Sequence, residues 1–253
     1  MRMDRREFVK LLAVAGGTVL TSLGARGEGR HDFRPAQLQY RGGQSVPYPS
    51  ALRSLMRALR LRTSIDADED KLDIEPSSPD LFRYPFLYLS GRNSFEPFSE
   101  EAVTKLRLFL KGGGFLLIDD ASGIDNSPFD NSVRLEIKRI MPENNMIKFD
   151  ADHTVFRSFY LLDRIGGRVI VKNYLEGITI GERSPVIYCH NDLGGAWATD
   201  LYERPIMECQ PGGERQREIA YRLGINIVMY ALCLNYKKER AHVEAILERR
   251  KIK

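Results

Sequence analysis

Two short apolar runs, separated by one amphipathic segment, constrain the fold of this chain more than any other feature. Residues 86–90 and 115–118 show no alternation between apolar and polar side chains, which is typical of strands buried on both faces of a sheet. Between them, Ser99 precedes an acidic turn and apolar residues at helical spacing, until the glycines at 112–114 end the pattern. We therefore predict a strand–helix–strand unit with parallel strands and a right-handed crossover.

Further strand and helix patterns extend this unit on both sides. Strands are predicted at 36–40, 71–75, 169–171, 178–180 and 186–189, with a short one at Ile147, and helices at 50–62, 131–140 and 216–234. The sequence contains neither an internal repeat nor a low-complexity segment. This order predicts a single open, doubly wound α/β domain over residues 26–236, followed by a charged helical tail over residues 237–253.

The N-terminus has the architecture of a secretion signal, with basic residues followed by an apolar run. The residues that resemble the twin-arginine translocation signal are Arg5, Arg6, Phe8 and Lys10. An amphipathic first helix of a cytosolic domain is the alternative, but the paired glycines 16–17 would break such a helix. We predict a signal peptide over residues 1–25, with the twin-arginine translocase as the partner during export.

The predicted destination is the periplasm or another extracytoplasmic space. The apolar run of the signal is too short to span a bilayer, which takes about 20 residues. We therefore expect no transmembrane helix in the mature protein. Three cysteines allow one disulfide in such an oxidising compartment, and Cys189 with Cys209 is the pair that we consider, with two separate thiols as the alternative. Cys233 lies in an apolar helical stretch and is expected in the core.

The net charge of +4 is concentrated at the two ends of the chain. Basic residues outnumber acidic ones in residues 1–25 and in the tail, so that the body between them is slightly acidic. Such a body offers no basic face for phosphate groups, and we predict no binding of nucleic acid. The basic tail suggests docking to a partner protein of the cell envelope as one alternative function.

Polar residues follow the predicted strands at three points, and ligands of open parallel sheets bind beyond the carboxyl ends of the strands. The residues that we single out for binding are Arg92, Asn93, Asp119, Ser122, Asp192 and Trp197. Trp197 is interpreted either as a stacking platform for a ring or as a residue that seals the sheet edge. His190, which also follows a strand, is a ligand or a hydrogen-bonded structural residue.

Asp120 and His153 are the candidates for catalysis. The adjacent carboxylates at 119–120 would suit a divalent metal or acid–base chemistry, with His153 or Asp192 as a further ligand. The structural alternative is that the carboxylates cap a helix or bind a turn, and that His153 lies at the surface. The sequence lacks a tight ligand spacing such as H-x-x-x-H, so both interpretations stay open. A shared site requires Asp119 or Asp120 to lie within about 10 Å of His153.

Nucleophilic catalysis has no motif in this sequence. There is no G-x-S-x-G elbow, and Ser122 does not form one. There is also no phosphate-binding or dinucleotide-binding glycine motif, because the glycines at 112–114 precede a strand, whereas phosphate cradles follow one.

Six segments together resemble one bacterial family. They are 38–43, 84–91, 112–120, 149–156, 191–197 and 224–232, and they span nearly all of the expected mature domain. The sequence is identified as a member of the family catalogued as domain of unknown function 4159. The resemblance implies a three-layer flavodoxin-like fold with an open, mainly parallel sheet. It also implies a relation to class I glutamine amidotransferases and to the trehalose-utilisation-like group, but no activity.

In amidotransferases of this fold the nucleophilic cysteine follows a central strand, and the corresponding place here holds Asp119 and Asp120. A carboxylate cannot perform thiolate chemistry on glutamine. The sequence also departs from the family pattern at Thr154 and at residues 195–196, where it lacks an acidic residue. That loss weakens the expectation of a metal site in this member.

Three functions are therefore weighed from the sequence. The first is an exported ligand-binding or accessory domain that uses the strand ends and lacks the amidotransferase nucleophile. The second is a metal-assisted hydrolase of a carbohydrate or peptide-like substrate, with Asp120 as base and His153 or Asp192 as a ligand. The third is a scaffold in an envelope complex.

Overall fold

The computed structural model describes the backbone of residues 33–251 and the side chains of residues 33–233. Within these residues seven strands form one sheet, in the order β2-β1-β3-β4-β7-β6-β5. The strands are β1 (Ala36–Leu38), β2 (Leu72–Ile74), β3 (Phe86–Gly91), β4 (Phe115–Asp120), β5 (Ile147–Lys148), β6 (Glu176–Ile180) and β7 (Arg183–Cys189). The predicted signal residues Arg5, Arg6, Phe8 and Lys10 lie outside the described residues.

The first five strands of the sheet are all parallel. β1 pairs with β2 and β3, β3 with β4, and β4 with β7, whereas β6 and β5 extend the sheet by antiparallel pairing. The order of the five parallel strands is that of flavodoxin-like sheets, in which the strand order reverses beside the first strand. The mixed α/β architecture predicted from the sequence is confirmed.

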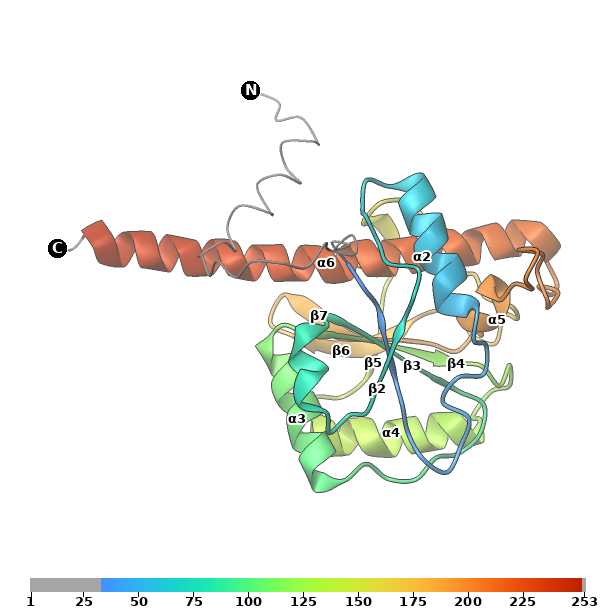
Figure 1. The fold of residues 1–253 in the computed structure, drawn as a ribbon, viewed down its shortest axis with the longest axis horizontal. Helices are drawn as coiled ribbons and strands as arrows, with labels where there is room; N and C mark the ends of the chain where they lie inside the picture. Colours follow the sequence, from blue (N-terminus) through green and yellow to red (C-terminus); the bar gives the residue numbers. More distant parts are fainter. Residues whose placement is uncertain (1–32, 252–253) are drawn as a thin grey trace, which may run out of the picture. The chain divides into compact units, whose positions relative to one another are not determined.

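Helices cover both faces of the sheet and give three layers (Figure 1). The helices α2 (Ala51–Arg62), α5 (Leu193–Trp197) and α6 (Gly213–Lys251) lie on one face, and α3 (Glu100–Gly112) and α4 (Pro128–Ile140) lie on the other. Two 3-10 helices, η1 (Pro79–Arg83) and η2 (Thr154–Arg157), connect other elements. Alternate side chains of the central strands enter two separate cores, which explains why β3 and β4 carry apolar residues without alternation.

The central strand–helix–strand unit has the predicted form. Ser99 caps α3, because its hydroxyl accepts a hydrogen bond from the backbone N–H of Ala102 at 3.2 Å. Gly113 ends the helix in the left-handed conformation, with φ of +119°. β3 and β4 then pair in parallel from Phe86 opposite Phe115 to Gly91 opposite Asp120.

Two local predictions are wrong. Residues 169–171 form no strand, because the backbone N–H groups of Val169 and Val171 bind Asn191 instead of a neighbouring strand. Cys233 is exposed on α6 rather than buried in the core. The predicted helix over 216–234 is part of the longer α6, whose backbone continues through most of the charged tail, while the side chains of the tail lie outside the described part.

Cys189 and Cys209 are both buried thiols and form no disulfide with each other. No helix among residues 33–251 combines the length and the apolar composition needed to cross a membrane.

Candidate functional site

The sheet brings the polar residues after β3, β4 and β7 to one edge. Ser90 pairs with Asp119, and Asp119 pairs with Cys189, so that the carboxyl ends of these three parallel strands are neighbours. The residues that follow the strands, from Arg92 on one side to Asp192 on the other, therefore surround the same part of the sheet.

Asp119 is completely buried and holds the loop that follows β7. Its carboxylate accepts hydrogen bonds from the backbone N–H groups of Leu193 at 2.8 Å and Gly194 at 2.7 Å, and from the hydroxyl of Tyr88 at 2.6 Å. A side chain at Gly194 would place its Cβ 2.8 Å from the Tyr88 hydroxyl, so that this approach requires glycine. Burial, together with the charge of Asp192, raises the pKa of Asp119 to about 7.

Asp192, in the loop that follows β7, is a second buried carboxylate close to Asp119. It has φ of +57°, a left-handed conformation that is uncommon for a residue other than glycine, and its side chain caps α5 through the N–H of Gly195 at 2.9 Å. Its other oxygen accepts hydrogen bonds from the Tyr48 hydroxyl at 2.9 Å and from the guanidinium of Arg168. Burial raises the pKa of Asp192, although Arg168 opposes the rise.

Two arginines meet at Tyr48. The guanidinium carbon of Arg92 lies 4.6 Å from the centre of the Tyr48 ring, and Arg168 also interacts with the Tyr48 hydroxyl. Burial and the charge of Asp192 raise the pKa of Tyr48 to about 12, while Arg92 acts against the rise. Arg92 is half-buried and forms no ion pair with a described residue, and Asn93 beside it is exposed.

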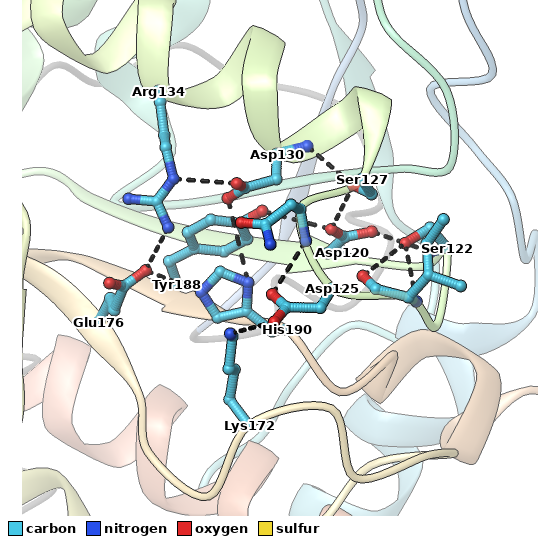
Figure 2. A network of polar contacts seen from close by, with 12 residues as sticks. Asp120, Ser122, Asp125, Ser127, Asp130, Arg134, Lys172, Glu176, Tyr188 and His190 are labelled. Atoms are coloured by element: carbon cyan, nitrogen blue, oxygen red, sulfur yellow. Dashed lines mark hydrogen bonds and ion pairs between the residues drawn. The ribbon is translucent and has the colours of Figure 1, made fainter.

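Asp120 points to the opposite face of the sheet from Asp119, where it belongs to a polar network (Figure 2). One oxygen accepts a hydrogen bond from the backbone N–H of Ser122 at 2.9 Å. The other accepts bonds from the hydroxyls of Ser127 at 2.6 Å and Tyr188 at 3.4 Å. Asp120 is 1% exposed, so that its carboxylate stabilises the turn before α4 and does not contact solvent.

His190 occupies the centre of this network (Figure 2). Its Nε2 lies 2.8 Å from Glu176, and its Nδ1 lies 4.0 Å from a buried oxygen of Asp130 that has no hydrogen-bond partner. Arg134 joins the same two carboxylates, at 2.9 Å from Asp130 and 2.7 Å from Glu176. The hydrogen bond from His190, followed by that from Arg134, holds the pKa of Glu176 at about 2.

The structure does not bring His153 to Asp120. The Nε2 of His153 lies 3.0 Å from the hydroxyl of Ser184, at the beginning of β7. Cys189, which pairs with Asp119, lies at the other end of this strand, and a rise of about 3.3 Å per residue separates Ser184 from Cys189 by roughly 16 Å. His153 and the strand-end carboxylates therefore occupy opposite edges of the sheet.

Trp197 lies in the core. It is 0% exposed, and its indole N–H donates to the carbonyl of Ala220 on α6 at 3.0 Å. A fully buried ring offers no stacking platform at the surface, and Trp197 packs in the core beneath α6 rather than at a sheet edge. Ser122 is half-buried and turns toward Ile124, so that it lies at the rim of the network.

No group of three or more His, Cys, Asp or Glu side chains within the described part of the chain is arranged to hold a metal ion. The carboxylates of Asp119 and Asp120 point to opposite faces of the sheet and are each engaged by several donors. The residues present therefore do not fit the divalent metal considered from the sequence.

Sequence reasoning missed most of the partners of these groups. None of these partners lies at the carboxyl end of a parallel strand: Tyr48 and Arg168 come from loops, Asp130 and Arg134 from α4, and Glu176 from the beginning of β6. For Arg168 the sequence does contain a signal, since paired glycines immediately before it indicate a place where the backbone packs closely. A Cβ on Gly167 would lie 2.1 Å from the carbonyl oxygen of Asn191, so that this glycine marks a tightly packed loop.

Comparison with protein families shows where this chain belongs. The family model described as a domain of unknown function (DUF4159) matches residues 34–232. No curated protein matches the sequence.

Proposed function

This chain belongs to the DUF4159 family, and because that family is described only as a domain of unknown function, we propose its activity from the site. The proposal is that the chain is an exported domain that binds a small anionic ligand at the carboxyl edge of its sheet. Arg92 and Arg168 hold the anion, and Asn93 lies at the rim. The observation that carries the proposal is the meeting of two guanidinium groups at Tyr48.

The charge balance at Tyr48 favours an anion. Among the described residues, Asp192 is the carboxylate bound to both Tyr48 and Arg168, and its hydrogen bonds from Arg168, Tyr48 and Gly195 already occupy it. Asp119 lies close by, but with a pKa of about 7 it carries only part of a negative charge near neutral pH. Arginine presents a planar fork that binds carboxylate or phosphate with two parallel hydrogen bonds. The Arg92 guanidinium lies against Tyr48 and has no ion-pair partner among the described residues.

The strand-end carboxylates support a binding domain rather than a hydrolase. Asp119 and Asp120 hold a helix and a turn through backbone N–H groups, and neither contacts solvent. A general base must come within hydrogen-bond reach of its substrate. We further propose that the fold is related to class I glutamine amidotransferases. In that relation, Asp119 and Asp120 replace the nucleophile after β4 and serve as structural anchors.

Titration calorimetry with inorganic phosphate and with succinate tests the binding site. We expect one of these anions to bind with a dissociation constant below about 1 mM, and Arg92→Gln to weaken it at least about tenfold. Arg92→Lys keeps the charge but loses the fork and should give an intermediate affinity. The control is Arg83→Gln, whose side chain is 74% exposed on η1. The proposal is refuted if neither anion binds, or if Arg92→Gln binds as tightly as the wild type.

Export is the second part of the proposal, and it rests on the sequence of residues 1–25. A fusion of these residues to a folded reporter should reach the periplasm. Replacing Arg5 and Arg6 by lysine should keep the reporter in the cytoplasm, whereas Arg2→Lys, outside the motif, should not. Periplasmic reporter in the twin-lysine fusion would contradict a twin-arginine route.

A further inference from the structure

A cavity of about 320 Å³ opens at the carboxyl ends of β1 and β2, on the α3 side of the sheet. Its lining comes from residues 39–41 after β1, residues 75–77 after β2 and the segment 96–99 that leads into α3. The strand order of the sheet reverses between β1 and β3, where ligands of doubly wound sheets bind, and the segments that follow both of these strands contribute to the lining. The volume is at the lower end of the range for small-molecule sites, about 300–1,000 Å³.

Three charged side chains line this cavity without an ion pair. They are Arg41, Glu75 and Glu96, and none of them has a partner of opposite charge among the described residues. Arg41 and Glu96 are adjacent in space, because the backbone N–H of Glu96 donates to the carbonyl of Arg41 at 2.8 Å. Their side chains share one cavity but do not neutralise each other.

This set of charges differs from the arginine pair at Tyr48. There, two arginines lie at Tyr48 beside an engaged carboxylate, whereas here one arginine and two glutamates line a small cavity. A purely anionic ligand would meet repulsion from Glu75 and Glu96, and a purely cationic one would meet Arg41. A small ligand with both an ammonium and a carboxylate group pairs with all three.

From the charges that line it, we infer that the cavity beside β1 is a second binding site, which takes a small zwitterion of the amino-acid type. The ammonium group lies between Glu75 and Glu96, and the carboxylate pairs with the guanidinium of Arg41. The apolar part of the lining includes Pro97, which is exposed, with Phe98 and Ala102 behind it. The site is separate from the anion site at Arg92, so that either can exist without the other.

The test uses the full chain and isothermal titration calorimetry with the common L-amino acids. The amino acid that binds best is then compared with its 2-hydroxy acid, which lacks the amine, and its amide, which lacks the carboxylate. Both analogues should bind at least about tenfold more weakly. Arg41→Gln and Glu96→Gln should each weaken the amino acid by a similar factor. Because Arg41 and Glu96 are exposed, these variants should fold normally.

Glu143→Gln is the matched control, since its side chain is 80% exposed and lies outside the cavity. Equal binding of the amino acid and either analogue would overturn the inference, as would the absence of amino-acid binding at about 10 mM ligand. Loss of amino-acid binding in Arg92→Gln but not in Glu96→Gln would assign the ligand to the site at Tyr48 and would also overturn it.

Discussion

Replacing Asp119 by asparagine should change how the free energy of unfolding depends on pH. The pKa of Asp119 is raised from about 3.8 to about 7 in the folded chain, mainly by burial and then by Asp192. As the pH rises between these values, the unfolded chain releases this proton and the folded chain keeps it. The group therefore lowers the free energy of unfolding by about 1.4 kcal/mol per pH unit, or roughly 4 kcal/mol in total.

Asparagine cannot ionise, so that Asp119→Asn removes this cost above pH 7. The amide has one oxygen where the carboxylate has two, and it leaves one of the N–H groups of Leu193 and Gly194 without an acceptor. That loss costs about 1–3 kcal/mol at every pH. The variant should therefore be equally or less stable than the wild type near pH 4.5, where the raised pKa costs the wild type only about 1 kcal/mol, and equally or more stable near pH 8.

Urea unfolding at several pH values between about 4.5 and 8 measures this change. The difference in unfolding free energy between variant and wild type should change sign across this range. Asp152→Asn, whose side chain is 99% exposed, is the control and should shift stability by less than about 0.5 kcal/mol. A difference for Asp119→Asn that stays constant with pH would show that Asp119 is ionised throughout, and would refute the reasoning.

Three further predictions concern other buried groups. The pKa of Glu176 is held at about 2 by His190 and then Arg134. Ionised Glu176 therefore stabilises the fold fully above about pH 4.5, and this stabilisation is lost as the pH falls toward 2. In Glu176→Gln, the free energy of unfolding should fall by roughly 1–2 kcal/mol less than in the wild type over this acid range. Asn226 accepts hydrogen bonds from two backbone N–H groups and donates to two carbonyls of the segment 155–160. Asn226→Ala should therefore lower the free energy of unfolding, measured by chemical denaturation, by about 2–4 kcal/mol. A loss below about 1 kcal/mol would contradict this prediction. Gly167→Ala should lower the melting temperature by several degrees, because its Cβ would lie 2.1 Å from the Asn191 carbonyl, and an unchanged melting temperature would show that the loop moves freely.

The central unit of the fold was predictable because its signals are local. The apolar runs of β3 and β4 lie close in sequence, and the capping of α3 by Ser99 depends on residues within one turn. The strand predicted at residues 169–171 is wrong because its contacts are not local. Its apolar residues resemble a strand, but their backbone partners come from Asn191, which pattern reasoning cannot place beside them.

The candidate site was predictable only in part. The rule that strand ends converge correctly placed Arg92, Asp119, Asp120 and Asp192 at one edge of the sheet. The opposite faces of Asp119 and Asp120 follow from alternation along β4, but whether solvent reaches a side chain depends on neighbours distant in sequence. His153 shows the same limit, since its loop leads to the opposite edge of the sheet.

The loop at Asp192 would also link the proposed anion binding to the completion of folding. The hydrogen bond from Tyr48 to Asp192 joins residues that are 144 positions apart in the sequence, and the one from Gly194 to Asp119 joins residues that are 75 positions apart. Contacts of such long range carry a large loop-closure cost and form when most of the chain is already ordered. In a partly folded chain, β3 and β4 would already pair, but Arg92 and Arg168 would not yet lie together at Tyr48. An anion that binds there recognises only the finished protein, and by mass action it stabilises that state alone.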